Sequence, residues 1–118
     1  MTITRHQVED VTVLCLKGRL ILYDGDLLLR QRIDELLASG DTRVLLDLQG
    51  IDYIDSAGIG MLVAKYVSVR RTGGDMKLVS LSPRVHRALS LAGLLDVFET
   101  FDAEAAAVRS FSGSVTSH

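Results

Sequence analysis

The sequence feature that most constrains the fold is an almost unbroken apolar run over residues 44–48, which only Asp47 interrupts. Such a run is typical of a central strand that is covered on both faces of its sheet. A helical pattern follows, with apolar positions at Ile59, Leu62, Val63, Tyr66 and Val67. A further strand-like run covers residues 76–81. This order of strand, helix and strand predicts two parallel strands joined by a right-handed crossover.

The segments before and after this unit predict further elements. Two β-rich runs, over residues 3–7 and 11–17, flank a short polar turn and are expected to pair as a hairpin. Residues 50–55 are interpreted as the connection from the central strand to the next helix. Near the carboxyl end, an apolar segment over residues 94–98 is predicted to end as a short edge strand.

The predicted order of elements is β-β-α-β-α-β-α-β-α. Helices between strands indicate an α/β layered sandwich, and its sheet is mixed because the first two strands form a hairpin. We expect the helices to pack mainly on one side of this mixed β-sheet. A chain of 118 residues suits one hydrophobic core, so we expect a single domain over residues 1–111 and a flexible tail over 112–118.

Composition and charge argue against several classes of protein. The net charge is −2 and the Lys and Arg residues are scattered, which argues against a nucleic-acid-binding surface. No apolar run approaches the ~20 residues of a membrane-spanning helix, and the N-terminus lacks the pattern of a signal peptide. The single cysteine, Cys15, lies between Leu14 and Leu16. We therefore expect a buried, inert thiol and a reducing, cytoplasmic location.

A stretch of small residues at the start of the second predicted helix carries the main functional candidate. It consists of Asp55, Ser56, Ala57, Gly58, Ile59 and Gly60. Ser56 is well placed to be the N-cap of that helix. The partial positive charge of a helix N-terminus favours an anion, so a phosphate on this hydroxyl would be tolerated. The residues alone leave both a capping serine and a regulated serine open, and capping is the simpler interpretation.

Catalytic chemistry has little support in the sequence. The Gly-x-Ser-x-Gly motif is absent, and His6, His86 and His118 lie in a predicted strand, on a predicted helix and at the chain end. We therefore expect that the protein is not an enzyme. Gly58 and Gly60 form only a fragment of a dinucleotide-binding motif, because Val63 stands where the third glycine is required. No cofactor is expected, although the sequence leaves nucleotide binding open on a weak signal.

Four aspartates are the candidates for a metal-binding cluster of carboxylates. They are Asp24, Asp47, Asp52 and Asp55. Loop carboxylates more often form solvated turns, so we expect no metal site.

Several short motifs, taken in order, resemble one known family. They are Leu16-x-Gly18-Arg19-Leu20, the run over 44–48, Ile54 with the stretch from Asp55 to Gly60, residues 73–78, Ser82-Pro83-x-Val85, and Gly93-Leu94-x-x-x-Phe98. Together they resemble the STAS domain, named for sulfate transporters and anti-sigma factor antagonists. The resemblance extends from Val11 to about Phe111, and it implies a STAS-like fold for nearly the whole chain.

The resemblance implies an anti-sigma factor antagonist that works by partner switching. Unphosphorylated antagonists of this type bind an anti-sigma factor that is itself a serine kinase, which frees a sigma factor for transcription. The kinase phosphorylates a serine at the start of the second helix, and a serine phosphatase resets the switch. Ser56 matches the phosphorylated position, so the resemblance favours a regulated serine over simple capping.

The resemblance also implies a docking surface for the kinase around Ser56. Its expected residues are Asp24, Asp55, Ala57, Gly58, Ile59 and Met61. Many antagonists carry an aspartate where this chain has Ile21, and here Asp24 comes three residues later. This departure bears on kinase recognition more than on the fold. The alternatives are a scaffold or transporter-associated subunit that binds its partner constitutively, and a small nucleotide-binding sensor; a homodimer is also possible.

Overall fold

The computed structural model describes residues 1–116, with side chains described up to residue 112. The elements are β1 (Thr2–Val8), β2 (Val11–Leu20), α1 (Gly25–Ala38), β3 (Arg43–Ile54), α2 (Ser56–Arg71), β4 (Asp75–Val79), α3 (Pro83–Leu91), β5 (Thr100–Phe101) and α4 (Glu104–Thr116). Their types follow the predicted order.

The strands form one mixed sheet whose spatial order is β1-β2-β3-β4-β5. β1 pairs antiparallel with β2, which confirms the predicted hairpin. β2 with β3, β3 with β4, and β4 with β5 all pair in parallel. The α/β class and the mixed sheet are therefore confirmed.

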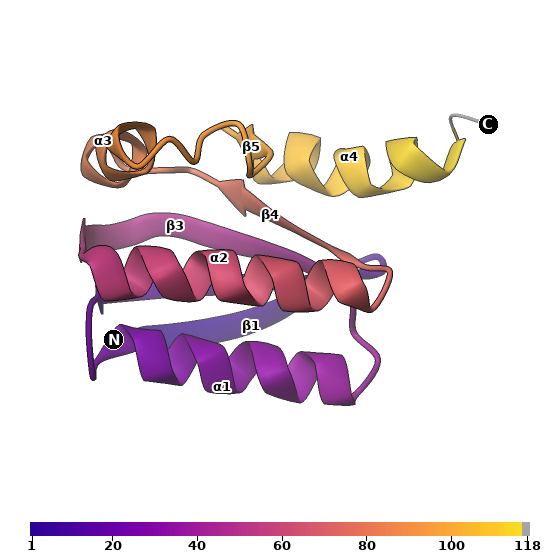
Figure 1. Cartoon of the computed structure of the whole chain (residues 1–118). Helices are drawn as coiled ribbons and strands as arrows, with labels where there is room; N and C mark the ends of the chain where they lie inside the picture. Colours follow the sequence, from indigo (N-terminus) through magenta and orange to yellow (C-terminus); the bar gives the residue numbers. More distant parts are fainter. Residues whose placement is uncertain (117–118) are drawn as a thin grey trace.

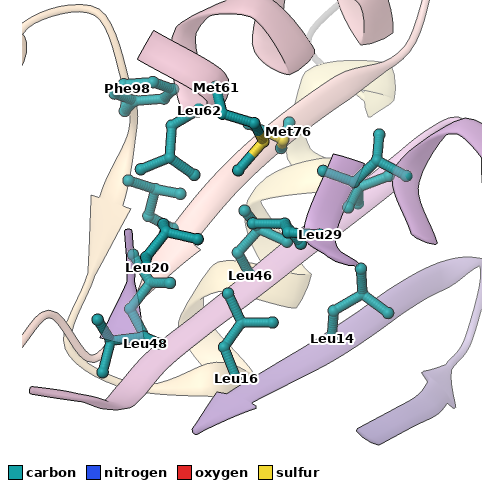
Figure 2. Close-up of a cluster of buried hydrophobic side chains, with 14 of the residues drawn as sticks. Leu14, Leu16, Leu20, Leu29, Leu46, Leu48, Met61, Leu62, Met76 and Phe98 are labelled. Atoms are coloured by element: carbon teal, nitrogen blue, oxygen red, sulfur yellow. The ribbon is translucent and has the colours of Figure 1, made fainter. Parts of the chain in front are cut away.

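The helices cover the two faces of the sheet unequally. α1, α2 and α3 contribute their buried side chains to one large cluster, and α1 and α2 lie side by side over the sheet (Figure 1). In Figure 2, Leu29 of α1 lies beside Leu46 of β3 within this cluster. A smaller cluster joins α4 to the opposite face through Ala107, Val108, Phe111, Val11, Val13, Leu45 and Val79. The expectation of helices mainly on one side therefore agrees with this packing.

A buried lysine fastens α4 to β4. Lys77 is 3% exposed, and its Nζ donates a hydrogen bond of 2.8 Å to Oγ of Ser110. The same Nζ lies 3.4 Å from a carboxylate oxygen of Glu99 and 4.6 Å from the ring centre of Phe111. A buried charge needs such partners, because removal from water without them costs several kcal/mol.

β3 is longer than predicted, because residues 50–54 continue the strand instead of forming a connection. Ile54 is buried and ends the strand. Gly50 lies so close to β2 that an added Cβ would be 2.6 Å from the carbonyl oxygen of Leu16. The register of β2 against β3 shifts at the same place, so this glycine marks an irregularity within the ladder and not a turn.

The carboxyl-terminal part also differs from the prediction. Residues 94–98 form turns, and the edge strand is β5 instead. Phe98 of this segment is buried, and its ring meets the ring of Tyr66 edge to face at a centroid distance of 5.2 Å. α4 continues to Thr116, beyond the predicted end of the folded domain at residue 111. The flexibility of the tail over 112–118 stays a prediction, and residues 117–118 lie outside the described part.

Within residues 1–116, no helix combines the length and the apolar character needed to cross a bilayer.

Candidate functional site around Ser56

Ser56 is the first residue of α2, at the edge of the sheet where the parallel strands β2 and β3 end. Its side chain is exposed, and within the described residues its hydroxyl has no hydrogen-bond partner. The backbone beside it is fixed, because the N–H of Asp55 donates to the carbonyl of Leu20 at 3.3 Å. The Ser56 hydroxyl is therefore exposed on a backbone that a hydrogen bond to β2 holds in place.

The N-cap of α2 is Asp55 and not Ser56, which corrects the sequence prediction. Asp55 has an extended backbone, and its Oδ1 accepts a hydrogen bond of 2.9 Å from the N–H of Gly58. The hydrogen bond from Gly58, and next the one from Leu22, lower the pKa of the Asp55 carboxyl below its usual value. The carboxylate next to Ser56 is thus held in its ionised form near neutral pH.

The second oxygen of Asp55 fastens the loop between β2 and α1. Oδ2 accepts a hydrogen bond of 3.0 Å from the N–H of Leu22. The N–H of Asp24 closes a turn on the carbonyl of Ile21 at 3.1 Å. One carboxylate therefore joins the start of α2 to the loop that carries Asp24.

Asp24 is partly exposed in this loop. Its carboxylate lies 3.6 Å from the amino group of Met1, and its side chain is 39% exposed. The other two aspartates of the suggested cluster lie in different surroundings: Asp47 accepts a hydrogen bond of 3.0 Å from the N–H of Gln49, and Asp52 is exposed. Among the described residues, no three His, Cys, Asp or Glu side chains gather in a way that could hold a metal ion.

Gly58 has a packing role in the structure. It is buried, and an added Cβ would lie 2.2 Å from the carbonyl oxygen of Leu20. The missing side chain lets the first turn of α2 rest directly on the end of β2. The prediction that Gly58 presents a surface to a partner is therefore corrected.

Met61 is the second predicted docking residue that the structure places elsewhere. It is 2% exposed and lies in the large cluster, where Figure 2 shows it beside Met76. The prediction for Met61 is wrong, because this side chain faces the sheet. Ala57 and Ile59 are half-buried, so part of each can be touched from outside.

Sequence reasoning missed an apolar patch that adjoins this site. We call it the Tyr23 patch, and it consists of Leu22, Tyr23 and Leu27, which are 52%, 80% and 49% exposed. Tyr23 also has a φ of 62°, a left-handed conformation that is rare for a bulky residue. The signal available in the sequence was the run of apolar residues over 20–23, directly after Arg19.

A shallow cavity of about 740 Å³ lies at the same edge of the sheet. It is lined by Arg19, Asp52, Tyr53, Ser82, Pro83 and Arg84. α3 begins here, and Ser82 is its N-cap, as predicted, since its Oγ accepts a hydrogen bond of 3.3 Å from the N–H of Val85.

Cys15 and two of its neighbours lie on the other face of the sheet, beside α4. The thiol is half-buried, 3.9 Å from Nδ1 of His6, and Nε2 of His6 is 3.1 Å from Glu104. Burial first, and then the negative charges of Asp47 and Glu104, raise the pKa of the Cys15 thiol. The expectation of an unreactive thiol agrees with these surroundings, although the side chain is less buried than predicted.

Comparison with known proteins places the chain in a family. The model of the STAS domain matches residues 2–107. The anti-sigma F factor antagonist of Paenibacillus polymyxa is 28% identical over 95 residues, which cover 80% of each chain. The anti-sigma-B factor antagonist of Bacillus subtilis is 32% identical over 83 residues, which cover 70% of this chain and 73% of the relative.

A solved structure of an anti-sigma factor antagonist has a similar fold. The structure of the anti-sigma factor antagonist SpoIIAA in its unphosphorylated form superposes with a TM-score of 0.80 at 20% identity. The match covers 95% of this chain and 97% of that one. Because the family model spans most of the chain and the sheet, helices and strand order agree with it, the protein belongs to the STAS domain family.

Proposed function

We propose that the protein is an anti-sigma factor antagonist whose binding to an anti-sigma factor is switched by phosphorylation of Ser56. The names of its relatives support the general role. The observation that carries the switch is the exposed hydroxyl of Ser56, which has no hydrogen-bond partner in the described protein and stands at the first turn of α2. In this role the chain is the substrate of a kinase, and its own work is binding.

The surroundings of Ser56 suit a switch that acts through charge. A phosphate adds about −1.5 to −2 charges at neutral pH. The N-terminus of α2 favours this charge, so the fold should survive the modification. Asp55, however, is ionised and adjacent, so the local negative charge becomes large.

A partner that packs on Ala57 and Ile59 would have to remove water from this charge. Burial of an unpaired charge costs several kcal/mol, which is enough to abolish a protein–protein contact. Unphosphorylated protein would therefore bind the anti-sigma factor, and phosphorylated protein would be released. A phosphatase that removes the phosphate would restore binding without any refolding.

The test is intact-mass measurement and peptide mapping after incubation with ATP and each purified anti-sigma factor kinase of the source organism. We expect one phosphate on Ser56 in the wild type and none in Ser56→Ala. Ser68→Ala is the matched control on the same helix, because the Ser68 hydroxyl already donates to the carbonyl of Ala64 at 3.0 Å.

Binding of the separated forms is then measured by isothermal titration calorimetry. Loss of binding on phosphorylation supports the switch. If wild type and Ser56→Ala both bind a partner stably and neither carries a phosphate, the protein is a constitutive scaffold and the proposal is overturned.

A further inference from the structure

We propose that α4 is a releasable strap over the second face of the sheet, and that the buried ammonium group of Lys77 lowers the free energy needed to release it. While the strap is docked, Lys77 is held out of water. When the strap lifts, Lys77 is hydrated again and an apolar surface of β2, β3 and β4 is uncovered. This face lies opposite α1, α2 and α3, so the inference does not depend on the Ser56 switch.

The first argument is that α4 docks through few side chains. Its buried apolar residues are Ala107, Val108 and Phe111. They pack in the smaller cluster with four fully buried strand residues, which are Val11, Val13, Leu45 and Val79. Burial of this apolar surface favours the docked state. The three other helices share a much larger cluster on the other face, so α4 is the helix with the least apolar support (Figure 1).

The second argument is the weak helix propensity of α4 itself. Its last five residues, 112–116, read Ser-Gly-Ser-Val-Thr, and all of these types are poor helix formers. A helix of 13 residues is also marginal in water without tertiary contacts. α4 therefore depends on its contact with the sheet to stay helical. Release from the sheet and unfolding of the helix are expected to occur together as one local opening.

The third argument is the charge beneath the strap. Nζ of Lys77 donates a hydrogen bond of 2.8 Å to Oγ of Ser110, and a carboxylate oxygen of Glu99 lies 3.4 Å away. The rings of Phe101 and Phe111 are centred 5.9 Å and 4.6 Å from Nζ, and they offset part of the lost hydration.

Of the two polar partners of Lys77, only Ser110 belongs to α4. In the released state water replaces the Ser110 hydroxyl, while Glu99, which is 62% exposed, can stay beside Nζ. Desolvation of the ammonium group therefore opposes the docked state alone. The hydrogen bond fixes where α4 docks, and the buried charge makes α4 easier to lift.

Two substitutions should therefore act in opposite directions. Lys77→Met removes the charge and leaves no buried polar atom unpaired, because Glu99 is exposed and Ser110 already donates to the carbonyl of Ala107 at 2.6 Å. Replacement of a buried ion by an apolar residue of similar volume is often stabilising, so α4 should open less. Ser110→Ala leaves Lys77 charged and without its hydroxyl partner, so α4 should open more. Alanine is the better helix former, so this loosening could not come from helix propensity.

The test is native-state hydrogen exchange, followed by mass spectrometry at urea concentrations below the unfolding transition. In wild type, we expect the amides of residues 104–112 to exchange faster than those of β3 and with little dependence on urea. Lys77→Met should slow exchange of this segment roughly tenfold, and Ser110→Ala should speed it roughly tenfold. Lys65→Met is the matched control, because the Lys65 side chain is only 13% exposed and pairs with Asp34 at 2.8 Å, away from α4.

Unchanged or faster exchange of α4 in Lys77→Met overturns the inference, because the lysine would then do no more than tie the helix down. Exchange of α4 with the urea dependence of β3 in wild type also overturns it, since α4 would then open only when the whole domain unfolds. Equal slowing in Lys65→Met would assign the effect to the stability of the whole domain, with the same consequence. Circular dichroism checks that each variant is folded. If Lys77→Met does not fold, unchanged or slower exchange of α4 in Ser110→Ala overturns the inference.

Discussion

Gly58→Ala, compared with Gly60→Ala on the same helix, tests how α2 is seated on the sheet. A Cβ at position 58 would lie 2.2 Å from the carbonyl oxygen of Leu20 and 3.0 Å from Cγ1 of Ile54. The oxygen belongs to the backbone of β2, so it cannot rotate aside as a flexible side chain can. At position 60, no atom outside the helix lies within 4 Å of the added Cβ. The two variants therefore differ in packing and share the same change in composition.

The expected magnitudes follow from two opposing effects. Alanine is favoured over glycine in a helix interior by about 1 kcal/mol, so Gly60→Ala should raise the free energy of unfolding by up to that amount. At Gly58 the same gain is opposed by overpacking, which costs about 1–3 kcal/mol and the most where backbone must move. We expect the unfolding free energies of the two variants to differ by about 2 kcal/mol.

Urea unfolding followed by circular dichroism measures both free energies. A difference of this size corresponds to several degrees in the melting temperature of a domain of about 100 residues. Displacement of α2 should also weaken partner binding by Gly58→Ala, while Gly60→Ala leaves the helix start in place. Equal stability of the two variants would refute the argument, because it would mean that α2 does not rest on the end of β2.

Three further predictions concern a cap, a carboxylate and the thiol. Ser82→Ala should lower the free energy of unfolding by about 1 kcal/mol in urea titrations, since it removes the cap on Val85; an unchanged midpoint would contradict this role. The folded-state pKa of Asp55 is lowered, so its contribution to stability is present above its unfolded pKa and is lost as the pH falls through the folded value. The melting temperature of Asp55→Asn should therefore fall less steeply with decreasing pH than that of wild type. The same slope in both proteins would contradict this role of the Asp55 carboxylate. Because burial and Asp47 raise the pKa of Cys15, iodoacetamide should react more slowly with the folded protein at pH 8 than with the urea-unfolded chain; equal rates would show an accessible thiolate.

The order of elements could be predicted because it depends on local patterns. The unbroken apolar run around Leu46 indicated the central strand, and Ser82 before Pro83 indicated a helix start. The length of β3 could not be predicted in the same way. Gly50 in a polar context indicates a turn, and its role in the ladder depends on Leu16, which lies far away in the sequence.

The site shows a similar division. The position of Ser56 at the start of α2 could be predicted, but Asp55 and Ser56 are equally good caps, and the end of β3 decides between them. The face of α2 that packs on the sheet was harder to predict, because apolar residues occur all around this helix. Contact of Gly58 with β2 accompanies an inward-facing Met61, and Val67, which the predicted apolar stripe included, is 41% exposed.

The agreement between strand order in the sheet and strand order in the chain has a consequence for synthesis. As the chain leaves the ribosome, every strand finds its neighbour already made, and none has to insert between two that are paired. At each stage the strand made last forms the free edge of the sheet. The strand that could pair with another nascent chain therefore changes each time a new strand is added. The last strand to be added is β5. Its two residues form too few backbone hydrogen bonds to pair stably with a strand of another chain.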